Sequence, residues 1–121
     1  MKIGLIAVNG VQVAEVTGEA KSLKGPQDVH DLIGEIAFNH GVTRVLASRE
    51  LIDESFFDLR SGFAGELAQK FSNYRMKLAV VGDFSFIESL ALKAYIFESN
   101  LGNTVRFLED RAKAMDWLAR A

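Results

Sequence analysis

The sequence predicts one α/β domain over residues 1–121, in two or three layers, with a mixed, mostly parallel five-stranded sheet, an N-terminal hairpin and about four helices. Three observations carry this prediction. Two β-rich runs flank Asn9-Gly10, strand-like and helical segments then alternate in the order ββαβαβαβα, and the length is that of one domain. A chain of this length buries about two-thirds of the surface that it exposes when unfolded, so it needs no disulfide or metal to fold.

The chain begins with a predicted antiparallel hairpin, followed by a helix. Asn9-Gly10 adopts positive φ readily, and this favours a tight turn between the β-rich residues 3–8 and 11–17. Gly25-Pro26 then marks a helix start, because proline suits the first helical position. This helix ends at Gly41, and its apolar face consists of Val29, Leu32, Ile33, Ile36 and Ala37.

Strands and helices alternate in the rest of the chain. The predicted strands cover residues 42–47, 78–81 and 104–108. The second of these is continuously apolar, as expected of a central strand that is covered on both faces. The predicted helices cover residues 60–74, 85–100 and 110–119, after a helical turn within 53–58. The inward face of the first of these helices consists of Phe63, Ala64, Leu67, Phe71 and Tyr74.

Ser85 and Glu88 have the spacing of a capping box, in which each side chain satisfies a free backbone N–H at a helix start. We therefore expect the third helix to begin at Ser85. In an open α/β sheet, ligands bind beyond the carboxyl ends of the parallel strands. Three loops follow those ends, at residues 48–53, 82–85 and 109–110.

Composition narrows the function classes. The net charge is −2, and the 14 basic residues are scattered among 16 acidic ones, so we expect no nucleic-acid partner. The chain has no cysteine, which excludes thiolate chemistry and suits a reducing compartment. No apolar run approaches the ~20 residues of a membrane helix, and we expect a cytoplasmic protein without a membrane contact. No nucleotide-binding loop or metal-ligand spacing occurs, so we expect neither a cofactor nor a metal.

Distinctive segments from Phe56 onward carry a family resemblance. They read FFDL, GFAGE, QKFSNYR, AVVGDF and FESN, beginning at residues 56, 62, 69, 79 and 97. With them the chain resembles the bacterial family called domain of unknown function 4180, over nearly its whole length and most densely from Phe56 to Gly102. That family has no established activity, so the resemblance implies no catalytic residue.

The order of elements is also similar to that of the sulfate-transporter and anti-sigma-factor-antagonist domains. Those modules act mainly by binding proteins, and many carry a phosphorylated serine in an Asp-Ser-Ser-Gly turn before the second helix. Ser61 and Gly62 match that turn, whereas Leu59 and Arg60 stand in place of the acid and the first serine. This departure weighs against a phosphorylation switch, and the likeness concerns the fold.

Arg60 and Ser61 form one candidate site. Ser61 at a helix start could bind or receive phosphate, because free N–H groups and the helix dipole favour an anion there, and Arg60 could pair with it. The alternative is that Ser61 only caps the helix, as serine commonly does. Gly62 and Gly65 do not form a nucleotide loop, and we expect them to allow close helix packing against the sheet or a second subunit.

Asp83 forms a second candidate site, because a carboxylate after a buried strand can bind a metal or act as a general base. Acids in the neighbouring loops could converge on it, namely Glu50, Asp53, Glu109 and Asp110. The alternative is structural, since acids are favoured at helix starts and Asp83 can cap the turn before Ser85. We favour the structural interpretation of these acids.

Phe56, Phe57, Phe84 and Phe86 lie in or beside predicted loops, away from any periodic apolar face, in a chain with nine phenylalanines. Loop aromatics often form the wall of a pocket or a surface for a partner. The alternative is a second small core beneath the loops. The sequence leaves both open.

Two functional hypotheses follow. The favoured one is a non-enzymatic binding or regulatory module, which uses the Phe-rich loops and the second helix for a homodimer or a protein partner. The alternative is a small enzyme or ligand-binding protein with a pocket at the strand carboxyl ends near Asp83, where Asp83 and Arg60 supply polar contacts and phenylalanines form the walls. Ser85 is a further candidate for binding a ligand or a partner. No catalytic motif supports the second hypothesis.

Overall fold

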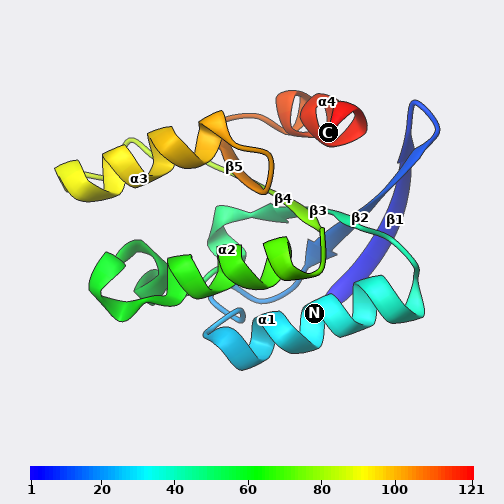
Figure 1. Cartoon of the computed structure of the whole chain (residues 1–121), viewed down its shortest axis with the longest axis horizontal. Coiled ribbons are helices and arrows are strands. Elements are labelled where there is room, and N and C mark those ends of the chain that lie inside the picture. The colour runs from blue at the N-terminus through cyan, green and yellow to red at the C-terminus, as the bar shows by residue number, and fades with distance from the viewer.

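The computed structural model describes residues 1–121, and it has a five-stranded sheet between two layers of helices (Figure 1). The strands are β1 Lys2–Val8, β2 Val11–Thr17, β3 Arg44–Ser48, β4 Lys77–Val81 and β5 Val105–Leu108. The helices are α1 Pro26–Ile33, α2 Phe63–Asn73, α3 Leu90–Leu101 and α4 Arg111–Arg120. The predicted α/β class is confirmed, in its three-layer form.

The sheet is mixed, and its strands follow one another in chain order from β1 to β5. The β1–β2 pair is antiparallel, whereas β2–β3, β3–β4 and β4–β5 are parallel. In the parallel part Leu46 pairs with Ala79, and Val80 pairs with Phe107. The carboxyl ends of β2 to β5 therefore meet at one edge of the sheet, and the loops after them lie together there.

The hairpin turn between β1 and β2 has the backbone conformation that its sequence predicts. Asn9 and Gly10 have φ values of 50° and 81°, which is the double positive-φ geometry of a type I′ turn. This turn matches the right-handed twist of the flanking strands, and it places Val8 opposite Val11.

The larger core lies between the sheet and the α1–α2 layer. It contains buried residues from β2 to β5, from both helices and from the loops at the sheet edge. Phe63, Ala64, Leu67 and Phe71 are buried as predicted. Tyr74 is not: α2 ends at Asn73, and the exposed Tyr74 ring instead packs edge-on against Phe38, with centroids 6.3 Å apart.

A smaller core lies under α4 on the opposite face of the sheet. Its members are Val13, Leu46, Ala79, Ala114, Trp117 and Leu118. Asp110 caps α4, because its Oδ1 accepts a hydrogen bond of 2.7 Å from the backbone N–H of Lys113. The α4 helix thus covers the face that α1 and α2 leave open (Figure 1).

Two helix starts differ from the prediction. A 3₁₀ turn occupies Leu59–Ser61, and α2 begins at Phe63 because Gly62, with φ of 78°, breaks the helical path. The capping box at Ser85 is wrong. Asp83 accepts the N–H of Ser85 in a tight turn, and the helix cap is Ser89, whose Oγ accepts from the N–H of Leu92 at 3.2 Å.

The first helix also departs from a regular α-helix. Its last part, Gly34–Asn39, is π-helical, and the chain then leaves at Gly41 with φ of 66°. No helix has both the length and the apolar character needed to cross a bilayer.

Candidate functional site

The four loop phenylalanines come together at the carboxyl edge of the sheet. Phe56 is only 1% exposed, and its ring centroid lies 5.1 Å from that of Phe57 and 5.7 Å from that of Phe63. Phe84 packs edge-on against Phe107 of β5, with centroids 5.5 Å apart. Such edge-to-face pairs are the geometry that aromatic quadrupoles favour.

The four rings therefore fit both interpretations in part: some form a core beneath the loops, and one remains available as surface. Phe56 belongs to the main core, and Phe57 and Phe84 pack against that core. Phe86 remains 48% exposed at the rim of the cluster, in edge contact with Phe57 at 5.5 Å. Phe86 alone presents substantial aromatic surface to solvent at this edge.

Arg49, which the sequence did not single out, covers the outer side of the cluster. Its guanidinium carbon lies 4.7 Å from the centre of the Phe86 ring, a cation–π contact. Its side chain runs across Gly82, where a Cβ atom would lie 2.7 Å from the Cβ of Arg49. The Nε atom is buried without a hydrogen-bond acceptor.

A hollow of about 430 Å³ opens beside Arg49. It is lined by Ala20, Lys21, Arg49, Glu50, Ile52, Glu54, Phe57 and Phe86. Lys21 and Glu54 are paired across its mouth, with 2.8 Å between Nζ and Oε1, and this pairing raises the pKa of Lys21. A second hollow lies between α3 and the 3₁₀ turn that carries Arg60.

Asp83 lies outside both hollows and is exposed to solvent. Its Oδ1 accepts the backbone N–H of Ser85 at 2.9 Å. Hydrogen bonds from the backbone and the side chain of Ser85, with a smaller contribution from the charge of Arg49, lower the pKa of this carboxyl below 3.8. The carboxylate is thus held ionised as a turn cap.

Among the other acids near this edge, Asp53, Asp58 and Asp110 serve as caps, whereas Glu50 and Glu109 are exposed and their carboxylates accept no hydrogen bond. Asp53 accepts from the N–H of Ser55, and Asp58 accepts from the N–H and the Nε of Arg60. Hydrogen bonds from Ser55 and Arg60 lower the pKa values of Asp53 and Asp58 respectively. No three acidic or histidine side chains lie close enough together to hold a metal ion.

Ser61 is held by its own loop. Its Oγ donates to the carbonyl of Ser55 and accepts the N–H of Phe63 at 3.2 Å, although the N-cap residue of α2 is Gly62. Gly62 is required by its positive φ, and a Cβ at Gly65 would meet nothing within 4 Å. The close packing expected of these two glycines is therefore wrong within this chain, and packing of a second subunit there stays a prediction.

Lowered carboxyl pKa values make stability pH-dependent, and we expect Asp83→Asn to expose this dependence. A carboxyl group whose pKa is lower in the folded state stabilises the protein at pH values above its ordinary pKa of 3.8. This contribution is lost as the pH falls through the folded-state pKa. Asp83→Asn should therefore be less stable than the parent near pH 7, and the difference should shrink by about pH 3. Urea unfolding at both pH values measures this, and a difference that stays constant would contradict it.

The most unusual surface of the molecule lies on α3. Leu90, Phe97 and Leu101 are 80%, 66% and 70% exposed, and Ala94 is exposed between them. These four residues define the outer face of α3. At about 100° per residue they form one continuous stripe, and we did not assign this face from the sequence.

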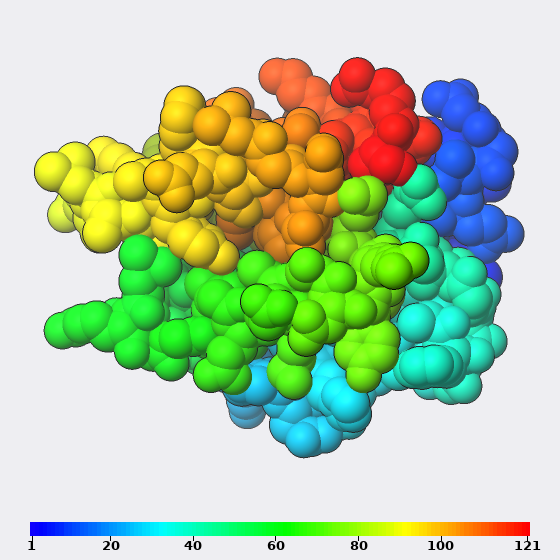
Figure 2. Space-filling view, in the orientation of Figure 1, coloured from blue at the N-terminus to red at the C-terminus, as the bar shows by residue number.

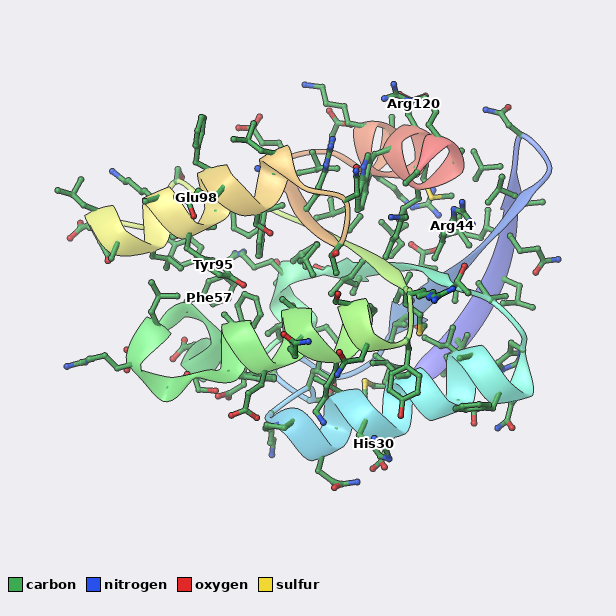
Figure 3. The ribbon with its side chains drawn as sticks, in the orientation of Figure 1. His30, Arg44, Phe57, Tyr95, Glu98 and Arg120 are labelled. Carbon is green, nitrogen blue, oxygen red and sulfur yellow. The ribbon has the colours of Figure 1, made fainter.

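The inner side of the same helix is attached to the domain by both apolar and polar side chains, since Leu92 is buried and Ile96 packs against the larger core. The amide of Asn100 both donates to the carbonyl and accepts the N–H of Phe107, at 3.1 Å and 2.7 Å, and Ser99 donates to the carbonyl of Val105. These bonds occupy the open edge of β5. Tyr95 donates to the carbonyl of Ala64 at 3.3 Å, and Figure 3 shows Tyr95 and Phe57 between α3 and α2. Partial burial raises the pKa of Tyr95.

The family model described as "Domain of unknown function (DUF4180)" matches residues 8–118. The chain belongs to that family. No curated protein sequence matches it. The family membership confirms the resemblance carried by the segments after Phe56, and it brings no assigned site residue.

The fold is shared with a solved structure from Thermotoga maritima, a protein provisionally described as an anti-sigma factor antagonist. The similarity has a TM-score of 0.52 at 15% sequence identity, and it covers 98% of this chain and 95% of the other. The likeness to the anti-sigma-factor-antagonist fold is thereby confirmed. At this identity it concerns the fold alone.

Proposed function

We propose that this chain is a non-enzymatic regulatory module that acts by binding another protein chain, and that the outer face of α3 is the contact surface. The observation that carries the proposal is a helix that is apolar on two opposite sides. Its inner side is occupied, since Leu92 is buried and Ser99 and Asn100 bond to β5, whereas Leu90, Phe97 and Leu101 on the outer side lie in water. Exposed apolar patches of this kind mark interaction sites, because burying them gains about 25 cal/mol per Å².

The sheet edge offers weaker support for an enzyme. Arg60 and Asp83, the two polar residues of that hypothesis, are each engaged locally, Arg60 with Asp58 and Asp83 with Ser85. Ser61 is likewise engaged by its own loop. Catalytic groups are typically desolvated in a cleft, whereas the Arg60 side chain is 91% exposed and Asp83 lies outside both hollows.

The similar Thermotoga maritima protein adds an analogy for the binding function. Its provisional description is that of an antagonist of another protein. The proposal for this chain takes from it only the idea of a fold used for protein contacts. A bacterial origin, a cytoplasmic location and a homodimer stay predictions.

Site-specific crosslinking in cells tests the binding function. A photoreactive phenylalanine analogue in place of Phe97 should give a discrete adduct with a polypeptide, because the side chain would lie inside the contact. The same analogue in place of Lys113, on the exposed side of α4, is the matched control and should give none. Equal adduct yields at both positions, or none at either, would overturn the proposal.

A further inference from the structure

We infer that the chain that covers α3 is a second copy of this protein, with the two α3 helices packed parallel and in register. This inference rests on the proposed protein-binding function and names its partner. Three features support it: the spacing of the outer face, the charges beside that face, and the side of α3 on which the rest of the domain lies.

The outer face has the spacing of a coiled-coil seam. Leu90, Ala94, Phe97 and Leu101 are separated by four, three and four residues, which is the alternation of d and a positions in a heptad. The helix has 12 residues and is about 18 Å long, so the seam extends along its whole length. A seam of this kind accepts another helix with the same spacing.

Two opposite charges flank the seam. Lys93 and Glu98 are exposed, and at about 100° per residue they lie on opposite sides of the stripe, in g and e positions. Their separation of five residues is the g-to-e′ spacing of parallel coiled coils. In a parallel pair, Lys93 of each copy therefore lies beside Glu98 of the other, which gives two ion pairs.

The same charges disfavour an antiparallel pair. In that orientation a g position faces the g position of the other helix, so Lys93 would lie on the same flank as Lys93 of the second copy. Glu98 would likewise share a flank with its own counterpart. Charge complementarity thus selects both the partner and its direction.

The position of the domain leaves room for this arrangement. The inner side of α3 is tied to β5 by Asn100 and Ser99, and Leu92 is buried on that side, opposite the seam. The helix forms one outer margin of the molecule (Figure 2). The bodies of two copies joined at the seam therefore lie on opposite sides of the helix pair. A pair of three-turn helices buries less than the usual ~800 Å² per partner, so the association is reversible.

Single cysteines report the register directly, because the chain has none of its own. With Leu101→Cys, two in-register helices place the thiols opposite each other, and a disulfide-linked dimer should form under mild oxidation. In an antiparallel pair residue 101 of one copy faces residue 90 of the other. The two residues 101 are then about 16 Å apart along the axis, and no crosslink forms. Lys113→Cys on α4 is the control for random collision and should stay monomeric.

Charge exchange tests the two ion pairs. Lys93→Glu and Glu98→Lys each place like charges together, and each should weaken the dimer about tenfold in sedimentation experiments. An equimolar mixture of the two variants should restore association as a mixed dimer. Phe97→Glu should abolish association and leave the circular dichroism spectrum unchanged, because Phe97 is exposed in the domain.

The outcomes separate this inference from the function on which it rests. Crosslinking of Leu101→Cys and rescue in the charge mixture would support the parallel dimer. A monomer at all concentrations would overturn it, as would crosslinking only when Leu90→Cys and Leu101→Cys are mixed. If the parent is monomeric and the Phe97 adduct in cells contains a different polypeptide, the dimer fails and the binding function stands.

Discussion

Phe56→Ala should cost about 3–5 kcal/mol of unfolding free energy, the range for removing a fully buried aromatic ring. Phe56 is 1% exposed, and its ring contacts Phe57, Phe63 and Phe107 at centroid distances of 5.1, 5.7 and 5.9 Å. It therefore joins the loop 49–62, α2 and β5. Truncation would leave a cavity among three elements that cannot all move inward.

Urea unfolding at neutral pH measures this loss, and Phe86→Ala is the matched control. Phe86 belongs to the same aromatic cluster but is 48% exposed. It lies at the rim of the cluster, where it contacts Phe57 and Arg49. Its truncation should cost about 1 kcal/mol or less. Equal losses for the two variants would show that the cluster is not part of the core.

The fold could be predicted from local patterns because these patterns agree with the tertiary structure. Asn9-Gly10 specifies a turn type that few other dipeptides adopt, and the structure has that turn. The run at 78–81 is short and continuously apolar, as expected of a central strand covered on both faces, and in β4 Leu78 and Val80 lie in the larger core while Ala79 lies in the smaller one. In these segments, local preference and burial require the same conformation.

The helix starts were less predictable because several side chains compete for the same backbone groups. Ser85, Glu88 and Ser89 can all act near the start of a helix, and the sequence does not rank them. In the structure Asp83 already takes the N–H of Ser85, and Ile87 is buried 6 residues after β4 ends at Val81. The helix is therefore delayed to Ser89 by a contact that no local pattern contains.

The site could be predicted only in part, for a similar reason. The loop phenylalanines were noticed because they fit no periodic face. Arg49 was missed because its place over Gly82 and Phe86 depends on two loops that are far apart in the chain. The outer face of α3 was missed because Leu92 and Ile96 give the same helix a second apolar side, and the sequence does not indicate which side faces the sheet.

Gly82→Ala should destabilise the protein by about 1–3 kcal/mol, the usual cost of overpacking. A Cβ at this position would lie 2.7 Å from the Cβ of Arg49 and 3.2 Å from its Nε. The Cβ of Arg49 is fixed by its backbone, so a rotation of the side chain cannot relieve the closest contact. Either the loop after β4 or the 3₁₀ turn at Arg49–Leu51 must move, and Arg49 would then leave the ring of Phe86.

Gly65→Ala separates this steric effect from the general effect of replacing glycine. Gly65 lies in the first turn of α2 with open space around it, so alanine should stabilise that helix by up to about 0.5–1 kcal/mol. The two Gly→Ala variants should therefore have opposite signs in thermal unfolding. In an Arg49→Gly background the opposing Cβ is gone, and the cost of Gly82→Ala should largely disappear, because the double-mutant cycle isolates the contact between these two residues. A cost that persists in this background would place the strain elsewhere in the loop after β4.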